Sequence, residues 1–170
     1  MEYTVLSECC CFTGHRNLSK DGLYTAKLNV ENEVRRLYDQ GVRYFFSGGA
    51  LGFDMAASVA VQNLKAELKD IKLIIAQPCL NYNSSWTQSD RNHYESIFRL
   101  SDGVICVSNS NYFNGCMQIR DKYLVDNCGY MICWYDGRLS GGTLYTLNYA
   151  RKLKREVTNV YTDKLIGYGK

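Results

Sequence analysis

Short apolar runs alternate along the chain with longer stretches in which apolar and polar residues are mixed. The short runs are rich in β-branched, aromatic and cysteine side chains, which is typical of strands buried on both faces. We therefore predict strands at Cys9–Thr13, Val42–Ser47, Ile71–Gln77, Gly103–Ser108 and Tyr130–Tyr135, and a weaker sixth at Val157–Tyr161.

The mixed stretches carry apolar residues at steps of three and four, as amphipathic helices do. The two longest stripes are Leu23, Ala26, Val30, Val34 and Leu37, and then Met55, Ala56, Val59, Ala60, Leu64 and Leu68. Shorter stripes are Tyr94, Ile97 and Phe98; Met117, Leu124, Val125 and Cys128; and Leu144, Leu147, Ala150 and Leu153. Regular alternation of strands and helices predicts an α/β fold, a Rossmann-like open parallel sheet of about five to six strands with helices on both faces.

The length of 170 residues fits one domain. We expect a single Rossmann-like domain over residues 1–170, with its core over about 9–161 and a loosely held tail over 162–170. The hydrophobic share of 46% and the charged share of 22% are ordinary for a globular protein, which excludes a wholly disordered or fibrous chain.

Charge and cysteine usage narrow the class of protein further. A formal net charge of +3 is too weak to predict nucleic-acid binding and argues against such a partner. The eight cysteines form no C-x-x-C pair and only His15 and His93 could assist them, so we predict no metal site. The opening MEYTVLSE does not resemble a signal peptide, and no apolar run reaches the length of a membrane span. We expect reduced thiols and a cytoplasmic protein.

Candidate chemistry follows the strands, because open parallel sheets bind ligands beyond the carboxyl ends of their strands. Three glycine-bearing segments lie there, Thr13–Arg16, Ser47–Asp54 and Asp136–Thr143. Glycine lets a backbone approach a ligand closely, and the amides of a following helix bind anions. None of the segments is the G-x-G-x-x-G dinucleotide motif or a P-loop. Each glycine pair alone is typical of a tight turn, but together the loops favour a ligand that carries phosphate.

Several polar side chains in these loops have two interpretations each. Arg16 could neutralise a phosphate or be a solvated surface arginine. Asp54 could hold a ribose hydroxyl or complement a helix dipole. Thr143 and Ser140 could donate to phosphate or cap a helix. His15 could donate a proton or form a hydrogen bond within its turn, and we keep it with Asp54 and Asp136 as a weak catalytic candidate.

Two further features lie outside the glycine loops. Trp86 and Tyr82 follow the third predicted strand and could stack on a base or form an aromatic lid over the sheet. Cys116 stands near the start of the fourth predicted helix, where a thiol could be reactive or simply packed.

Five stretches in order, CCCFTGHR, FFSGGALGFDMAA, QPCLNYNSSW, GCMQIRDKYLVD and GGTLYTLNYA, resemble the SLOG superfamily. That superfamily joins the DNA-processing protein DprA and the LOG phosphoribohydrolases, and the chain is most similar to its small YpsA/YoqJ-like family of bacteria and phages. The resemblance implies a Rossmann-like fold that binds nucleotides or ADP-ribose-like molecules. It implies a pocket lined by Gly14, Arg16, Ser47, Gly48, Gly49, Asp54, Arg120, Gly141, Gly142 and Thr143.

Two departures from the superfamily pattern bear on activity. Thr146 stands where the LOG enzymes have a glutamate that takes part in cleavage, and a threonine cannot replace that carboxylate. The Arg-Asn-Arg of DprA is similar to Arg120-Asp121-Lys122 here, so Asp121 adds a negative charge beside the supposed phosphate site.

We therefore expect a protein that binds a nucleotide or nucleotide-derived molecule at the carboxyl edge of the sheet and acts as a sensor or a sequestering protein. The first alternative is a hydrolase that cleaves an N-glycosidic or phosphate bond in such a ligand, so whether the chain is an enzyme stays open at this point. The second is a DprA-like module for single-stranded DNA. No cofactor is required in any of these, and exposed sheet edges together with 14 tyrosines suit a homodimer.

Overall fold

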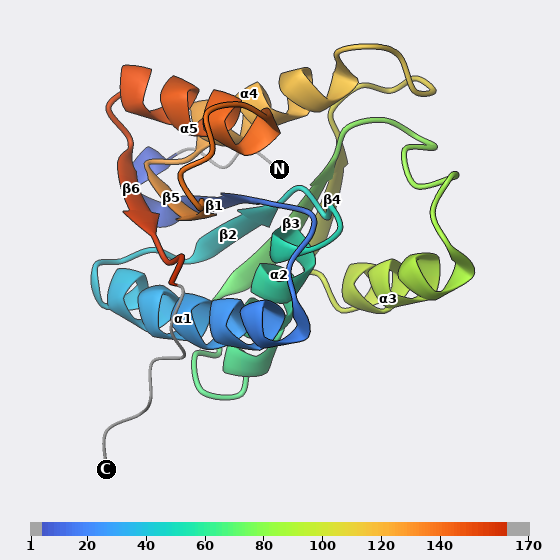
Figure 1. The fold of residues 1–170 in the computed structure, drawn as a ribbon. Coiled ribbons are helices and arrows are strands. Elements are labelled where there is room, and N and C mark those ends of the chain that lie inside the picture. The colour runs from blue at the N-terminus through green and yellow to red at the C-terminus, as the bar shows by residue number, and fades with distance from the viewer. Residues whose placement is uncertain (1–4, 163–170) are drawn as a thin grey trace.

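The computed structural model describes residues 5–162 and shows an open sheet between two layers of helices (Figure 1). The strands are β1 (Cys9–Gly14), β2 (Tyr44–Ser47), β3 (Lys72–Gln77), β4 (Gly103–Cys106), β5 (Tyr130–Trp134) and β6 (Glu156–Asn159). The helices are a 3-10 turn at Leu6–Glu8 and α1 (Lys20–Asp39), α2 (Phe53–Leu64), α3 (Gln88–Arg99), α4 (Cys116–Asn127) and α5 (Gly142–Lys152). Each strand overlaps the range predicted for it.

All neighbouring strands run parallel, in the order β4-β3-β2-β1-β5-β6. The chain builds outward from β1 to β4 and then returns across β1 to add β5 and β6. Because parallel crossovers are right-handed, this reversal places α1, α2 and α3 on one face and α4 and α5 on the other (Figure 1). The fold is therefore the predicted α/β, Rossmann-like parallel sheet, and its order reverses between β1 and β5.

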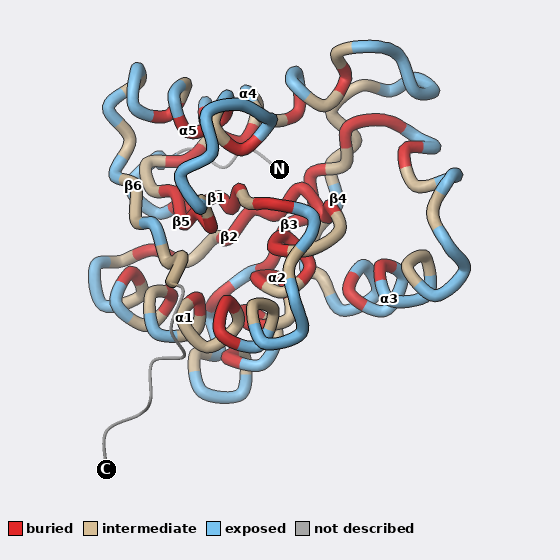
Figure 2. The backbone as a smooth tube through the Cα atoms, in the orientation of Figure 1, coloured by how far each residue is buried: buried red, intermediate tan, exposed pale blue. Residues whose placement is uncertain are grey.

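Each face of the sheet has its own hydrophobic core, since successive side chains of a strand point to opposite faces. Phe12, Phe45 and Phe53 belong to the core beneath α1 and α2. Phe46 and Met131 belong to the core beneath α4 and α5. The buried backbone in Figure 2 is accordingly concentrated in the central strands and in the helix faces turned toward them.

The expectation that every strand is buried on both faces is wrong for β4 and β6. Both lie at an edge of the sheet, and Val104 of β4 keeps 40% of its surface exposed. Within residues 5–162, no helix is both long and apolar enough to cross a membrane. The tail predicted over residues 162–170 lies outside the described residues, except for Thr162.

Candidate functional site

A crevice of about 810 Å³ opens at the carboxyl edge of the sheet, where the strand order reverses between β1 and β5. The loops after β1, β2 and β5 line it together with the first turns of α4. Of the predicted ligand-binding residues, those that line it are Gly14, His15, Arg16, Asp54, Arg120, Gly141, Gly142 and Thr143. The three glycine loops therefore converge, as the sequence predicts.

The loops after β1 and β2 fit against each other through glycines. A Cβ on Gly14 would lie 2.5 Å from the Phe53 side chain, and one on Gly52 would lie 2.2 Å from the carbonyl oxygen of Arg16. The amide of Phe53 donates a hydrogen bond of 3.1 Å to the carbonyl of His15. The first amide of α2 is thus already bonded within the protein, so this helix start is less available to a ligand than expected.

The buried Ser47-Gly48-Gly49 segment forms the layer behind the crevice and does not line it. A Cβ on Gly48 would lie 2.1 Å from the Arg120 guanidinium, and the carbonyl of Gly48 accepts a 2.6 Å hydrogen bond from Arg120 Nη1. The Ser47 hydroxyl accepts from the amide of Gly49 at 3.1 Å and from the hydroxyl of Ser58 at 2.8 Å. The expected contact of these three residues with a ligand is corrected: Gly48 holds the arginine, and Ser47 and Gly49 bond to each other behind the crevice.

The start of α5, in contrast, is open. Gly141 is the N-cap residue, with φ of +114°, and neither it nor Gly142 has any atom within 4 Å of a Cβ position. No side chain caps the helix, so the interpretation of Ser140 or Thr143 as a cap is wrong. The first amides of a helix have no partner within the helix, and the residues at this helix start line the crevice.

Two arginines of the crevice differ in their charge balance. Buried Arg120 donates through Nε to Asp121 Oδ1 at 2.8 Å, and the Thr146 hydroxyl donates to the other oxygen of Asp121 at 3.2 Å. Asp121 therefore neutralises the arginine beside it. Arg16 is exposed and makes no hydrogen bond or ion pair within residues 5–162, which makes it the cation best placed to meet an anionic ligand.

Asp54 lies buried at the floor of the crevice. Burial raises its pKa to about 6, although the nearby Arg120 guanidinium opposes the shift. One carboxylate oxygen accepts from the amide of Ala50 at 3.3 Å. A carboxyl group with this pKa changes its protonation state near neutral pH and could donate a proton.

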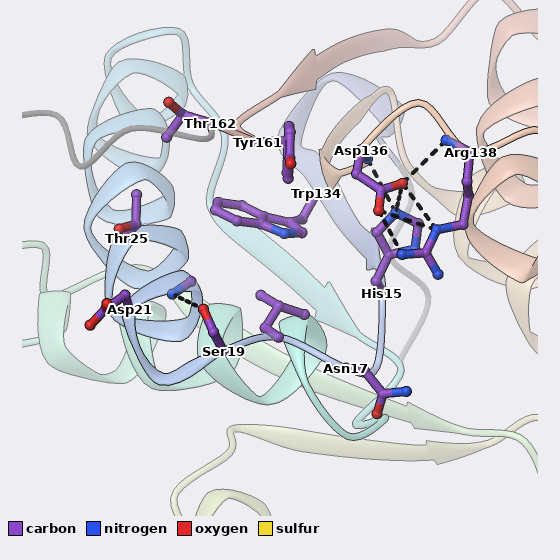
Figure 3. Close-up of a pocket in the computed structure, with 12 residues that line it drawn as sticks. His15, Asn17, Ser19, Asp21, Thr25, Trp134, Asp136, Arg138, Tyr161 and Thr162 are labelled. Carbon is purple, nitrogen blue, oxygen red and sulfur yellow. Dashed lines mark hydrogen bonds and ion pairs between the residues drawn. The ribbon is translucent and has the colours of Figure 1, made fainter.

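His15, Asp136 and Arg138 form a polar cluster at one end of the crevice (Figure 3). Arg138 Nη2 lies 2.6 Å from Asp136 Oδ2, and this contact holds the pKa of Asp136 well below its usual range. His15 Nε2 lies 2.9 Å from Asp136 Oδ1 and 3.2 Å from the backbone nitrogen of Asp136. Burial lowers the pKa of His15 more than Asp136 raises it, so the neutral ring is favoured.

The aromatic residues after β3 lie elsewhere. Trp86 and Tyr82 pack edge to face at 5.3 Å and both contact Tyr94 of α3, and neither lines the crevice. The placement of Trp86 in the ligand site is therefore corrected: the two rings form an aromatic cluster that joins the loop to α3. Cys116 is fully buried at the start of α4, in accord with a packed thiol.

Sequence reasoning missed two hollows beside the crevice. One is a groove of about 560 Å³ between α1 and α2, where Tyr24, Lys27 and Met55 meet Arg16. The other is a cavity of about 440 Å³ against Trp134 and the start of α1. A tryptophan at the end of a strand next to the reversal point was the only sequence signal for the second. Within residues 5–162, no group of three histidine, cysteine or acidic side chains is placed to hold a metal ion.

A Rossmann-like sheet with a glycine-lined crevice at its reversal point defines a class of small α/β proteins. The chain belongs to the YpsA family of that class, since the family described as "YspA SLOG family" matches residues 10–168. It is 33% identical to the prophage-derived protein YoqJ of Bacillus subtilis over 119 residues, which cover 64% of this chain and 69% of YoqJ. It is 23% identical to the UPF0398 protein YpsA of Bacillus subtilis over 136 residues, which cover 79% of this chain and 75% of YpsA.

Two solved structures share the fold. DNA processing protein A of Streptococcus pneumoniae superposes with a TM-score of 0.63 at 18% identity, over 87% of this chain and 48% of that protein. DNA processing protein A of Helicobacter pylori superposes with a TM-score of 0.61 at 19% identity, over 89% of this chain and 64% of that protein. The chain thus spans about half to two thirds of these proteins.

Proposed function

We propose that the chain binds a nucleotide or a nucleotide-derived molecule of the ADP-ribose type in the crevice and acts as a sensor or a sequestering protein. The phosphate would accept hydrogen bonds from the first amides of α5, and Arg16 would supply the counter-charge. Membership of the YpsA family of SLOG proteins supports a nucleotide-related ligand.

The observation that carries the proposal is the open start of α5 beside an exposed arginine. Gly141 and Gly142 place no side chain over the helix amides, and Arg16 on the facing loop has no ion-pair partner within residues 5–162. Both line the same crevice. Backbone amides at a helix start and a free guanidinium are the groups that proteins use to hold phosphate.

Binding without consumption is the direct test. ADP-ribose and AMP at 100 times their dissociation constants should stabilise the protein by about 2.7 kcal/mol, because a ligand selective for the native state shifts the unfolding equilibrium. We expect a rise in Tm and, by chromatography, full recovery of the ligand after hours of incubation. Arg16→Gln should reduce the Tm shift, while Arg99→Gln, an exposed arginine of α3, should not. Absence of any shift with either compound would contradict the proposal.

A hydrolase is the second candidate, and Asp54 is the observation that favours it. A buried carboxyl group with a pKa of about 6 at the crevice floor could protonate a leaving group while water attacks an N-glycosidic or phosphate bond. Asp136 is less suited because Arg138 and His15 occupy its oxygens. Slow release of free base or phosphate from AMP, lost in Asp54→Asn although AMP still binds, would favour this function over simple binding.

Single-stranded DNA is the third candidate. DNA processing protein A of Helicobacter pylori has a single-stranded DNA binding mode, which weighs against our expectation that nucleic acid is not a partner of this chain. The groove between α1 and α2 continues from the crevice through Arg16, and Tyr24 and Lys27 are placed there to meet a base and a phosphate. Retention of a labelled oligonucleotide that falls steeply with salt, and falls again in Tyr24→Ala, would favour this function.

A further inference from the structure

The cavity against Trp134 has the His15–Asp136–Arg138 cluster at one end (Figure 3). It is bounded by the first turns of α1 and by the ends of β5 and β6. His15 and Arg138 line this cavity and the crevice as well. The two hollows are therefore adjacent, and the cluster forms the wall that they share.

One side of the cavity is aromatic. The indole of Trp134 is 4% exposed and stacks on Phe53 at 6.3 Å, while Tyr161 meets it edge to face at 5.1 Å. The hydroxyl-bearing side chains of Ser19, which caps α1, and Thr25 of α1 lie across from this aromatic surface (Figure 3). A flat ring with hydrogen-bonding groups at its edge would meet an apolar surface on one side and polar groups on the other.

The charges of the two hollows have opposite signs. Asp21 and Asp136 stand against Arg138 alone in the cavity, because neutral His15 adds no charge. In the crevice, three arginines stand against two aspartates. The anionic part of a ligand therefore favours the crevice, and an uncharged or cationic part favours the cavity.

The start of α1 is not a second phosphate site. The Ser19 side chain caps it by accepting from the amide of Gly22 at 3.0 Å, and Asp21 already places a negative charge in the first turn. Both features disfavour an anion there. The cavity and the open start of α5 are thus suited to different chemical groups.

We propose that the cavity is a ring compartment, which takes the uncharged nucleobase of a nucleotide while its phosphate lies in the crevice at α5. The inference rests on the proposed function and adds to it the position of the base. The sugar would cross the shared wall, over His15 and Arg138. Selectivity for the ring would then be determined on α1 and β5, away from the residues that hold phosphate.

A comparison of AMP with ribose 5-phosphate tests the compartment, since the second compound keeps the phosphate and the sugar and lacks the ring. Thr25→Met fills the cavity from a residue that does not line the crevice. We expect the dissociation constant of AMP to rise about tenfold, as loss of base stacking would require, with that of ribose 5-phosphate unchanged within about twofold. Lys20→Met, at an exposed neighbouring position that lines neither hollow, is the matched control and should change neither constant.

Fluorescence gives an independent measurement that does not depend on a cavity-filling variant. The chain has two tryptophans, so Trp86→Phe leaves Trp134 as the only one. AMP should change the Trp134 emission, and ribose 5-phosphate should leave it unchanged. The ring compartment would be wrong if Thr25→Met weakened the binding of both compounds equally, or if AMP bound without changing the Trp134 emission. Phosphate binding in the crevice would stand in either case. If neither compound bound the unaltered protein, the proposed function would fail together with this inference.

Discussion

At the scale of single residues, the glycine pairs Gly48-Gly49 and Gly141-Gly142 have different structural roles, although they look alike in the sequence. Gly48 makes room for a buried side chain, because a Cβ there would lie 2.1 Å from Arg120. Gly141 lies in open space and adopts a positive φ that exposes the start of α5. The first glycine therefore supports the charge network beneath the crevice, and the second leaves its entrance free.

The buried carboxyl group of Asp54 makes stability depend on pH. Its pKa of about 6 in the folded protein exceeds the ordinary value of 3.8, so the folded state binds the proton more tightly than the unfolded chain does. Its favourable contribution is complete below about pH 4 and is lost as the pH rises through 6. A shift of about two pKa units corresponds to about 3 kcal/mol.

The contribution of Asp54 to the stability of the unaltered protein should therefore fall between pH 4 and pH 7, and Asp54→Asn has no such contribution to lose. Over this range the free energy of unfolding of Asp54→Asn should rise relative to that of the unaltered protein by up to about 3 kcal/mol. Denaturant unfolding at several pH values measures the difference, in which the contribution of His15 cancels. Asp70→Asn is the control, because the Tyr38 hydroxyl lowers the pKa of Asp70 from its ordinary value of 3.8. This variant should lose stability relative to the unaltered protein only as the pH rises toward 3.8, and the difference should stay level between pH 4 and pH 7. A difference between Asp54→Asn and the unaltered protein that did not vary with pH would show that Asp54 titrates normally.

At the scale of elements, the hydrogen bonds of a helix's first amides, and not the loop sequence before the helix, determine whether its start can bind an anion. Helices α2 and α5 both follow a glycine-bearing loop, but the first amide of α2 donates to the carbonyl of His15. The sequence cannot reveal this, because the contact joins two loops that are far apart in the chain. The start of α5 has no such contact and keeps its amides for a ligand.

Strands and helices were predictable because short apolar runs and stripes of period 3.6 are local properties of the chain. The convergence of three loops followed from the rule for parallel sheets. The contact of Arg120 with Gly48, the burial of Ser47 and the position of Trp86 were not predictable, because each depends on packing between distant segments. For the same reason, the sequence indicates the cavity against Trp134 only through a tryptophan at the end of a strand.

Removing one amide at the start of α5 tests its role without changing a side-chain charge. Proline is tolerated at the first position of a helix, where its missing N–H was not needed by the helix. Gly142→Pro should therefore leave the Tm within a few degrees of its original value. It should raise the dissociation constant of AMP at least about tenfold, since a hydrogen bond to a charged group contributes about 1.5–3 kcal/mol.

Calorimetric titration measures this loss, and Gln88→Pro is the matched control. Gln88 is likewise the first residue of a helix, α3, after a capping threonine with an extended backbone, and it lies outside the crevice. It should bind AMP normally. Equal binding by Gly142→Pro and the unaltered protein would place the phosphate somewhere other than at α5.

At the scale of the whole molecule, the sheet ends in two edges of different character. The strand β6 carries Glu156, whose side chain is 53% exposed and pairs with Arg36 of α1. The strand β4 is Gly-Val-Ile-Cys and has no charged side chain, and Val104 is 40% exposed. Charged side chains on edge strands are a common protection against pairing with another sheet, and β4 lacks that protection.

We therefore expect a homodimer in which β4 pairs with its copy across a two-fold axis, because an isologous contact uses the same surface twice and closes on itself. Light scattering coupled to size exclusion should give twice the mass of 19.4 kDa at micromolar concentration.

Val104→Lys should yield the monomer, since a lysine on each copy would bring like charges together at the axis. Leu139→Lys, at a side chain that is 94% exposed in the loop before α5, should remain dimeric. The crevice lies between β1 and β5, two strands inside the β4 edge, so the monomeric variant should bind AMP as tightly as the dimer. A monomer at every concentration of the unaltered protein would show that this edge is protected in some other way.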